Sequence, residues 1–130
     1  MKASLACAVA LVVALFSQPS VAKDSACLIE GSFKIMGKTI YSKDCVQSDP
    51  SESEATFKSS CKKLADSAKI FGGKAGNVTY MATCPTPSQG ICVGFAGGTR
   101  DAYYYARSPS DLKNLPSSCS KSGGRWKISE

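Results

Sequence analysis

The chain has 130 residues, of which 43% are hydrophobic and 20% charged, with a formal net charge of +6 and no histidine. This length suits one small domain, and the mild positive charge favours anionic partners only weakly. The absence of histidine excludes Ser-His-Asp and Cys-His catalytic arrangements and zinc sites with histidine ligands.

Residues 1–22 are typical of a cleaved secretory signal peptide. Lys2 supplies the early positive charge, residues 3–16 are apolar and uncharged, and Ser20 and Ala22 are small residues suited to a signal peptidase. The apolar run is shorter than the roughly 17–25 residues of a membrane span. We therefore expect cleavage near Ala22, a mature domain of residues 23–130 without a transmembrane segment, and a secreted or periplasmic location, with a start typical of bacterial signals.

The cysteine content predicts a disulfide framework. One of the seven cysteines, Cys7, leaves with the signal, and an even number in a small exported domain is typical of paired cysteines. The remaining ones are Cys27, Cys45, Cys61, Cys84, Cys92 and Cys119. Many pairings are open; we favour Cys84–Cys92 across one turn, then Cys27–Cys45 and Cys61–Cys119. No C-x-x-C pair occurs, so we expect neither a cysteine zinc site nor a thiol oxidoreductase.

The first half of the mature chain predicts a hairpin followed by a helix. Residues 28–36 and 39–46 are rich in β-branched and aromatic residues and are separated by Gly37-Lys38, which predicts a β-hairpin. Ser51, with Glu54 three residues later, predicts a helix start, and Gly72-Gly73 predicts its end. Apolar residues recur on one face of this helix at Phe57, Cys61, Leu64, Ala65, Ala68 and Phe71.

The second half predicts three strands and a short helix. Residues 77–84, 91–96 and 102–107 alternate as strands, with turns at 85–90 and Gly97-Gly98, so we expect an antiparallel meander. Ser108 and Pro109 predict a helix start and Pro116 its end, before a last edge strand over 125–128. The predicted fold class is α+β: a small disulfide-stabilised domain with a twisted antiparallel sheet, made of a hairpin plus a three-stranded meander, with one main helix packed on a face and a short C-terminal helix.

The sequence shows no recognisable catalytic arrangement. Its ten acidic residues are scattered, and no pair is singled out for carboxylate catalysis. A Ser–Lys pair cannot be recognised by spacing, because both residue types are abundant. The glycine-rich residues 94–100 lead into a strand rather than a helix, which favours a hairpin turn over a phosphate cradle. We expect no catalytic residue, no metal and no cofactor.

One aromatic and basic cluster is the best candidate for a binding surface. It consists of Arg100, Tyr103, Tyr105 and Arg107. The strand period places Tyr103, Tyr105 and Arg107 on a common face, with Arg100 reaching from the preceding turn. If that face points outward, it offers a platform for a protein, sugar or base; if it points inward, it belongs to the core. The next candidate is the loop over residues 85–90.

These features favour an exported, non-catalytic binding or inhibitory module. Its expected partner is a protein, an anionic envelope component or a glycan, and not a nucleic acid. Two alternatives stay open: a basic structural protein associated with the cell envelope, and a small hydrolase that works without histidine.

Overall fold

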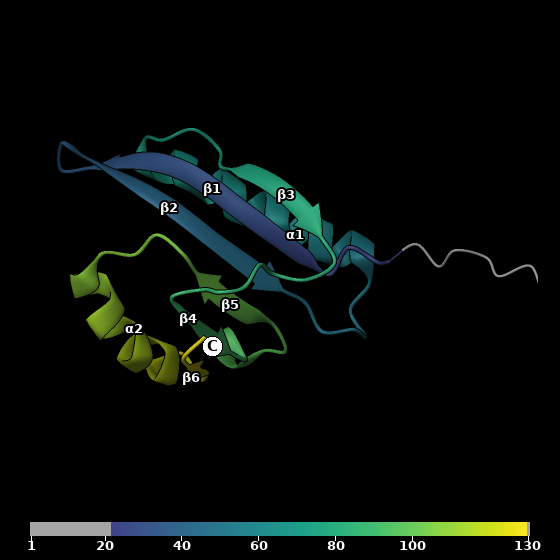
Figure 1. Ribbon diagram of the computed structural model, residues 1–130. Coiled ribbons are helices and arrows are strands. Elements are labelled where there is room, and N and C mark those ends of the chain that lie inside the picture. Colours follow the sequence, from purple (N-terminus) through teal and green to yellow (C-terminus); the bar gives the residue numbers. More distant parts are fainter. Residues whose placement is uncertain (1–21, 130) are drawn as a thin grey trace, which may run out of the picture.

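The computed structural model describes residues 22–129, so the signal peptide predicted over residues 1–22 lies outside the described part except for Ala22. The small α+β domain predicted from the sequence is confirmed (Figure 1). Within residues 22–129, no helix is both long and apolar enough to cross a bilayer. The elements in chain order are β1 (Ala26–Ile35), β2 (Lys38–Gln47), α1 (Glu54–Asp66), η1 (Ser67–Phe71), β3 (Asn77–Met81), β4 (Gly90–Val93), η2 (Phe95–Gly97), β5 (Asp101–Tyr104), α2 (Pro109–Lys121) and β6 (Arg125–Lys127).

The strands form one six-stranded antiparallel sheet in the order β3-β1-β2-β5-β4-β6. The predicted meander is wrong: β3 pairs with β1 at one edge, while β4 lies between β5 and β6 near the other edge. The reason is that α1 carries the chain from the end of β2 back over β1, whose outer edge then accepts β3. Residues 82–89, which we call the crossover segment, therefore traverse the sheet to reach β4 (Figure 1).

Strands β1 and β2 form the longest pairing in the sheet, from Ala26 opposite Gln47 to Ile35 opposite Lys38. Met36 and Gly37 make the turn, with φ angles of 50° and 78°. Two consecutive positive φ angles suit the right-handed twist of a two-residue hairpin loop. The turn thus lies one residue earlier than the predicted Gly37-Lys38.

The strand registers assign each side chain to one of two faces. Cys27 lies opposite Val46, which lies opposite Ala102, which lies opposite Cys92, so these four side chains share a face. We call it the helix face, because Cys27 is bonded to α1 and Cys92 to α2. The opposite face, which we call the crossover face, carries Cys45 and is crossed by the crossover segment, to which Cys45 is bonded. In Figure 1 this segment passes in front of the sheet and α1 lies behind it.

All six cysteines of residues 22–129 are paired, but each predicted pairing is wrong. The disulfides are Cys27–Cys61, Cys45–Cys84 and Cys92–Cys119, with Cα–Cα distances of 6.4, 5.9 and 5.7 Å. Cys27 and Cys45 cannot bond, because the register places them on opposite faces of the β1–β2 pair. Cys84 and Cys92 cannot close a hairpin, because β3 and β4 are not neighbours. Cys119 is bonded to β4, which leaves Cys61 for β1.

Helix α1 begins two residues later than predicted. Its N-cap is Ser53, whose hydroxyl accepts a hydrogen bond from the Thr56 N–H at 3.2 Å. Ser51 instead hydrogen-bonds the Asp49 carboxylate. Phe57, Cys61 and Ala65 are buried, as the apolar pattern predicts, and the helix continues as the 3₁₀ turn η1. Gly72, with φ 77°, ends it at the predicted position.

Helix α2 starts as predicted, with Ser108 as N-cap and Pro109 in the first turn, but Pro116 does not end it. A proline inside a helix removes one backbone hydrogen bond and costs about 3 kcal/mol. The next turn holds Cys119, which is buried at 5% exposure and bonded to Cys92. This anchoring of the last turn to β4 outweighs the local preference of proline.

The disulfide pattern gives a distinctive tryptic map. Cleavage after lysine and arginine places the six bonded cysteines in peptides 24–34, 44–58, 59–62, 75–100 and 114–121, with Cys84 and Cys92 together in 75–100. Without reduction, mass spectrometry should find 24–34 joined to 59–62, and 75–100 joined to both 44–58 and 114–121. A joined pair of 24–34 and 44–58 would contradict the structure.

Candidate functional site

A cleft of about 340 Å³ opens on the helix face, between α1–η1 and the middle of the sheet. Its floor is apolar and includes Ile29 of β1, Val46 of β2 and Ala102 of β5. Leu64 of α1 and Phe71 of η1 form the wall. The cleft is therefore a mostly apolar space, and its polar groups gather where β2 meets β5.

The polar end of the cleft is an ion pair between Asp44 and Arg107. Asp44 lies in β2 opposite Tyr104, and the Arg107 guanidinium donates to the Asp44 carboxylate. The side chains are 28% and 30% exposed, respectively. Within residues 22–129, Asp44 Oδ1 and Arg107 Nε are buried and have no hydrogen-bond partner. Both residues line the cleft, and the pair keeps one buried acceptor and one buried donor without a partner.

Arg107 is held in place by its backbone as well as by Asp44. The Gln89 side chain accepts a hydrogen bond from the Arg107 N–H at 2.8 Å and donates to the Arg107 carbonyl at 3.1 Å. Gln89 ends the crossover segment, and its own N–H donates to the Tyr104 carbonyl. These bonds fix the bend after β5 that turns Arg107 back toward the helix face.

Burial dominates the electrostatics of Asp44. It raises the pKa of the Asp44 carboxyl above its ordinary value, although Arg107 and the Ser42 hydroxyl act in the opposite direction. Among the described residues that line the cleft, Asp44 is the single carboxylate. The cleft therefore lacks the second acid that paired-carboxylate hydrolysis needs. No group of acidic, cysteine or histidine side chains in residues 22–129 is arranged to hold a metal ion.

A pair of stacked aromatic rings lies next to Arg107 at the polar end of the cleft. The rings of Tyr104 and Trp126 are stacked with centroids 5.8 Å apart, and the Arg107 guanidinium carbon lies 5.1 Å from the Tyr104 ring centroid. Burial raises the pKa of Tyr104. The Trp126 ring lies against Gly90, where a Cβ would come within 2.1 Å of it. Through Trp126, edge strand β6 therefore supports Tyr104, which lines the cleft.

The four residues predicted to form a binding surface do not come together. Arg100 forms an ion pair with Glu52, donates to the Ser60 hydroxyl at 3.0 Å, and lies over the Phe57 ring. It ties the loop before β5 to the segment that leads into α1. This arrangement makes Arg100 a structural link on the side of α1.

Tyr103 and Tyr105 lie on the crossover face, half-buried against the Cys45–Cys84 disulfide. The Tyr105 hydroxyl donates to the Pro85 carbonyl at 2.6 Å, and burial raises the pKa of Tyr105 to about 12. The predicted common face with Arg107 is wrong, because β5 ends at Tyr104 and the bend sends Arg107 to the helix face. The 85–90 loop belongs to the crossover segment and β4 rather than to a free hairpin.

Sequence reasoning named Arg107 but missed Asp44, which it counted among the scattered acids. A signal was present: Asp44 alternates with Val46 in a predicted strand and is adjacent to Cys45. A charge on the inward face of a strand is uncommon unless it is paired. Nothing local indicated that its partner would be Arg107.

Comparison with known proteins adds no relative. No family model matches the chain, and neither does any curated protein or solved structure. The function proposed below therefore rests on the residues of the cleft.

The ion pair predicts a pH-dependent effect of Arg107→Met. Arg107 lowers the pKa of buried Asp44, so its loss raises that pKa further above the unfolded value. Between the two pKa values the native state binds more protons than the unfolded state, so stability falls as pH rises. Urea unfolding should show a loss of about 1.5–3 kcal/mol at neutral pH that shrinks toward about pH 4.

The matched control for this experiment is the double variant Asp44→Asn with Arg107→Met, which has no charge at the site. It should be less destabilised at neutral pH than Arg107→Met alone and should lose the added pH dependence. Equal pH slopes in the two variants would show that Asp44 does not depend on Arg107.

The close contact between Gly90 and the Trp126 ring predicts that Gly90→Ala destabilises the protein, because the new methyl group would overlap that ring. We expect a loss of about 1–3 kcal/mol by urea unfolding and a red shift in the emission of the single tryptophan. Gly98→Ala is the control: its φ is −95° and its Cβ would meet only the Phe95 carbonyl at 3.5 Å. A similar loss in both variants would contradict the role of Trp126.

Proposed function

We propose that the protein is an exported, non-catalytic binding module whose cleft takes a small amphipathic molecule. One observation carries the proposal: an apolar cleft ends at an ion pair that retains a buried unsatisfied donor and a buried unsatisfied acceptor. Few convergent polar groups in a largely apolar concavity are typical of small-molecule sites.

The apolar part of the cleft suits a short hydrocarbon chain. Its volume of about 340 Å³ lies near the lower end of the range of roughly 300–1,000 Å³ for ligand pockets. Leu64 and Phe71 are 41% and 58% exposed, so a bound chain would remove their surface from water. Burial of such surface stabilises a complex by about 25 cal/mol per Å².

The polar end favours a neutral head group that both donates and accepts. A primary amide or a hydroxyl can donate to the Asp44 carboxylate and accept from the Arg107 guanidinium, both of which line the cleft. An anionic head group would bind Arg107 but be repelled by the Asp44 carboxylate. A cationic head group would bind Asp44 but be repelled by the Arg107 guanidinium. Since each unsatisfied buried polar group costs about 1–3 kcal/mol, the neutral head is preferred over either ion.

A binding role accords better with the cleft than a catalytic one. Asp44 is its single carboxylate among the described lining residues, and Arg107 neutralises it. Three disulfides fix both helices and the crossover segment, so little ordering is needed when a ligand enters. The protein or glycan partner predicted from the sequence has less support, because Tyr103 and Tyr105, the tyrosines predicted to bind it, are half-buried.

The test titrates the mature protein, residues 23–130, with octanamide, octanoate and octylammonium at neutral pH. These probes share a chain and differ in the head group. Calorimetry should show octanamide binding about five- to a hundredfold more tightly than either ion. Asp44→Asn with Arg107→Met should weaken octanamide binding and reduce the differences among the three probes.

A cleft-filling variant locates the binding. Ala68 lines the cleft, so Ala68→Phe should abolish binding of all three probes. Ala82→Phe is the control, because Ala82 is exposed on the crossover segment away from the cleft. Failure of every probe to bind the unsubstituted protein, or unchanged binding to Ala68→Phe, would refute the proposal.

A further inference from the structure

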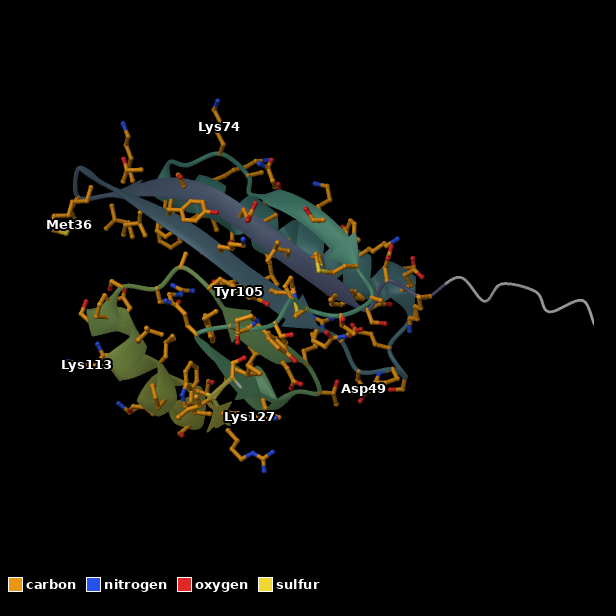
Figure 2. The ribbon with its side chains drawn as sticks, viewed as in Figure 1. Met36, Asp49, Lys74, Tyr105, Lys113 and Lys127 are labelled. Carbon is orange, nitrogen blue, oxygen red and sulfur yellow. A yellow bond between two sulfur atoms is a disulfide. The ribbon has the colours of Figure 1, made fainter. Side chains whose placement is uncertain are left out.

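The outer end of the β1–β2 hairpin carries exposed apolar side chains. Met36 is 98% exposed at the turn, and Ile35 and Ile40 are each 39% exposed beside it. Figure 2 shows Met36 at the far end of the hairpin, away from both helices. Phe71 of η1 is 58% exposed, and its ring centroid lies 6.3 Å from that of Phe33 in β1. We call Ile35, Met36, Ile40 and Phe71 the hairpin tip.

The charges next to the hairpin tip along the chain are all positive. Residues 31–42 and 67–76 contain Lys34, Lys38, Lys69 and Lys74 and no acidic residue. The nearest acids along the chain, Glu30 and Asp66, are engaged by Lys43 and by Lys62 and Lys69. Within residues 22–129, Lys34, Lys38 and Lys74 form no ion pair. Lys34 and Lys38, which flank the turn, are therefore uncompensated lysines at the tip, whereas Lys74 lies farther off and shares a hollow with Glu30 (Figure 2).

We infer that the hairpin tip docks onto an anionic lipid surface. Apolar side chains flanked by lysines are typical of interfacial membrane contacts, where the apolar groups enter the acyl boundary and the lysines meet phosphates. A stable protein interface buries about 1,200–2,000 Å² over two complementary surfaces. Three side chains at the end of a two-stranded hairpin and one from η1 offer much less, and Met36 projects rather than forming a flat patch. The shape and charge thus favour lipid over a protein partner.

Docking also has a consequence for the cleft. Phe71, a member of the tip, also lines the cleft, as does Phe33, whose ring is its neighbour. A docked tip therefore brings this end of the cleft to the lipid surface. The inference does not depend on the ligand proposed above, because tip and cleft are tested by different variants and different probes.

The test is co-sedimentation of the mature protein with vesicles of phosphatidylcholine alone or mixed with phosphatidylglycerol. We expect binding to the mixed vesicles that weakens as salt is raised, and at least about tenfold weaker binding to phosphatidylcholine. Met36→Ser with Ile40→Ser should weaken binding to the mixed vesicles about tenfold. Ile128→Ser is the apolar control, since Ile128 is 75% exposed near the C-terminus, and it should bind as the unsubstituted protein does.

A charge comparison separates local docking from attraction by overall charge. Lys34→Glu with Lys38→Glu should abolish binding to the mixed vesicles. Lys113→Glu with Lys127→Glu makes the same change in net charge at exposed positions on α2 and β6 (Figure 2). This variant should retain most of the binding to the mixed vesicles. All four side chains are exposed, so folding should persist, which circular dichroism checks. Equal losses in the two charge variants, or no binding to phosphatidylglycerol vesicles, would overturn the inference.

Discussion

The disulfide between Cys45 and Cys84 holds the crossover segment against one face of the sheet, and the rest of the architecture depends on this attachment. With the segment fixed there, the chain reaches the far side of β5 and adds β4 beyond it. Gln47 reinforces the attachment by accepting from the Cys84 N–H. One face of the sheet is thereby crossed by extended chain, and both helices are bonded to the other. The cleft lies on the face that the helices share.

The positions of the helices and strands could be predicted from the sequence far better than the pairing between the strands. The buried stripe of α1 follows from the spacing of Phe57, Cys61 and Ala65, and the start of α2 from Ser108 and Pro109. These signals are local, since hydrogen bonds and packing within a few residues decide them. Strand alternation indicates which side chains share a face but not which strand lies alongside. Strand alternation therefore does not indicate that β3 pairs with β1. Pairing consecutive strands led instead to the incorrect meander.

The polar end of the cleft shows the same limit at the level of side chains. Asp44 and Arg107 are 63 residues apart in sequence, and only the pairing of β2 with β5 brings them together. A strand period predicts orientation only while the strand lasts, and β5 stops at Tyr104. Beyond that point Gln89 sets the direction of the chain, through hydrogen bonds that sequence alone does not reveal. Arg100 was equally unpredictable, because its partner Glu52 lies 48 residues away.

The order of the cysteines along the chain bears on how the protein acquires its covalent structure. The bridges Cys27–Cys61 and Cys45–Cys84 interleave, so neither joins neighbouring cysteines. Oxidation that proceeds from the N-terminus as the chain emerges would join Cys27 to Cys45 first. That bond is incompatible with the finished sheet, because the two residues occupy opposite faces. Along that route the native bridges form only after thiol–disulfide exchange has broken the early bond.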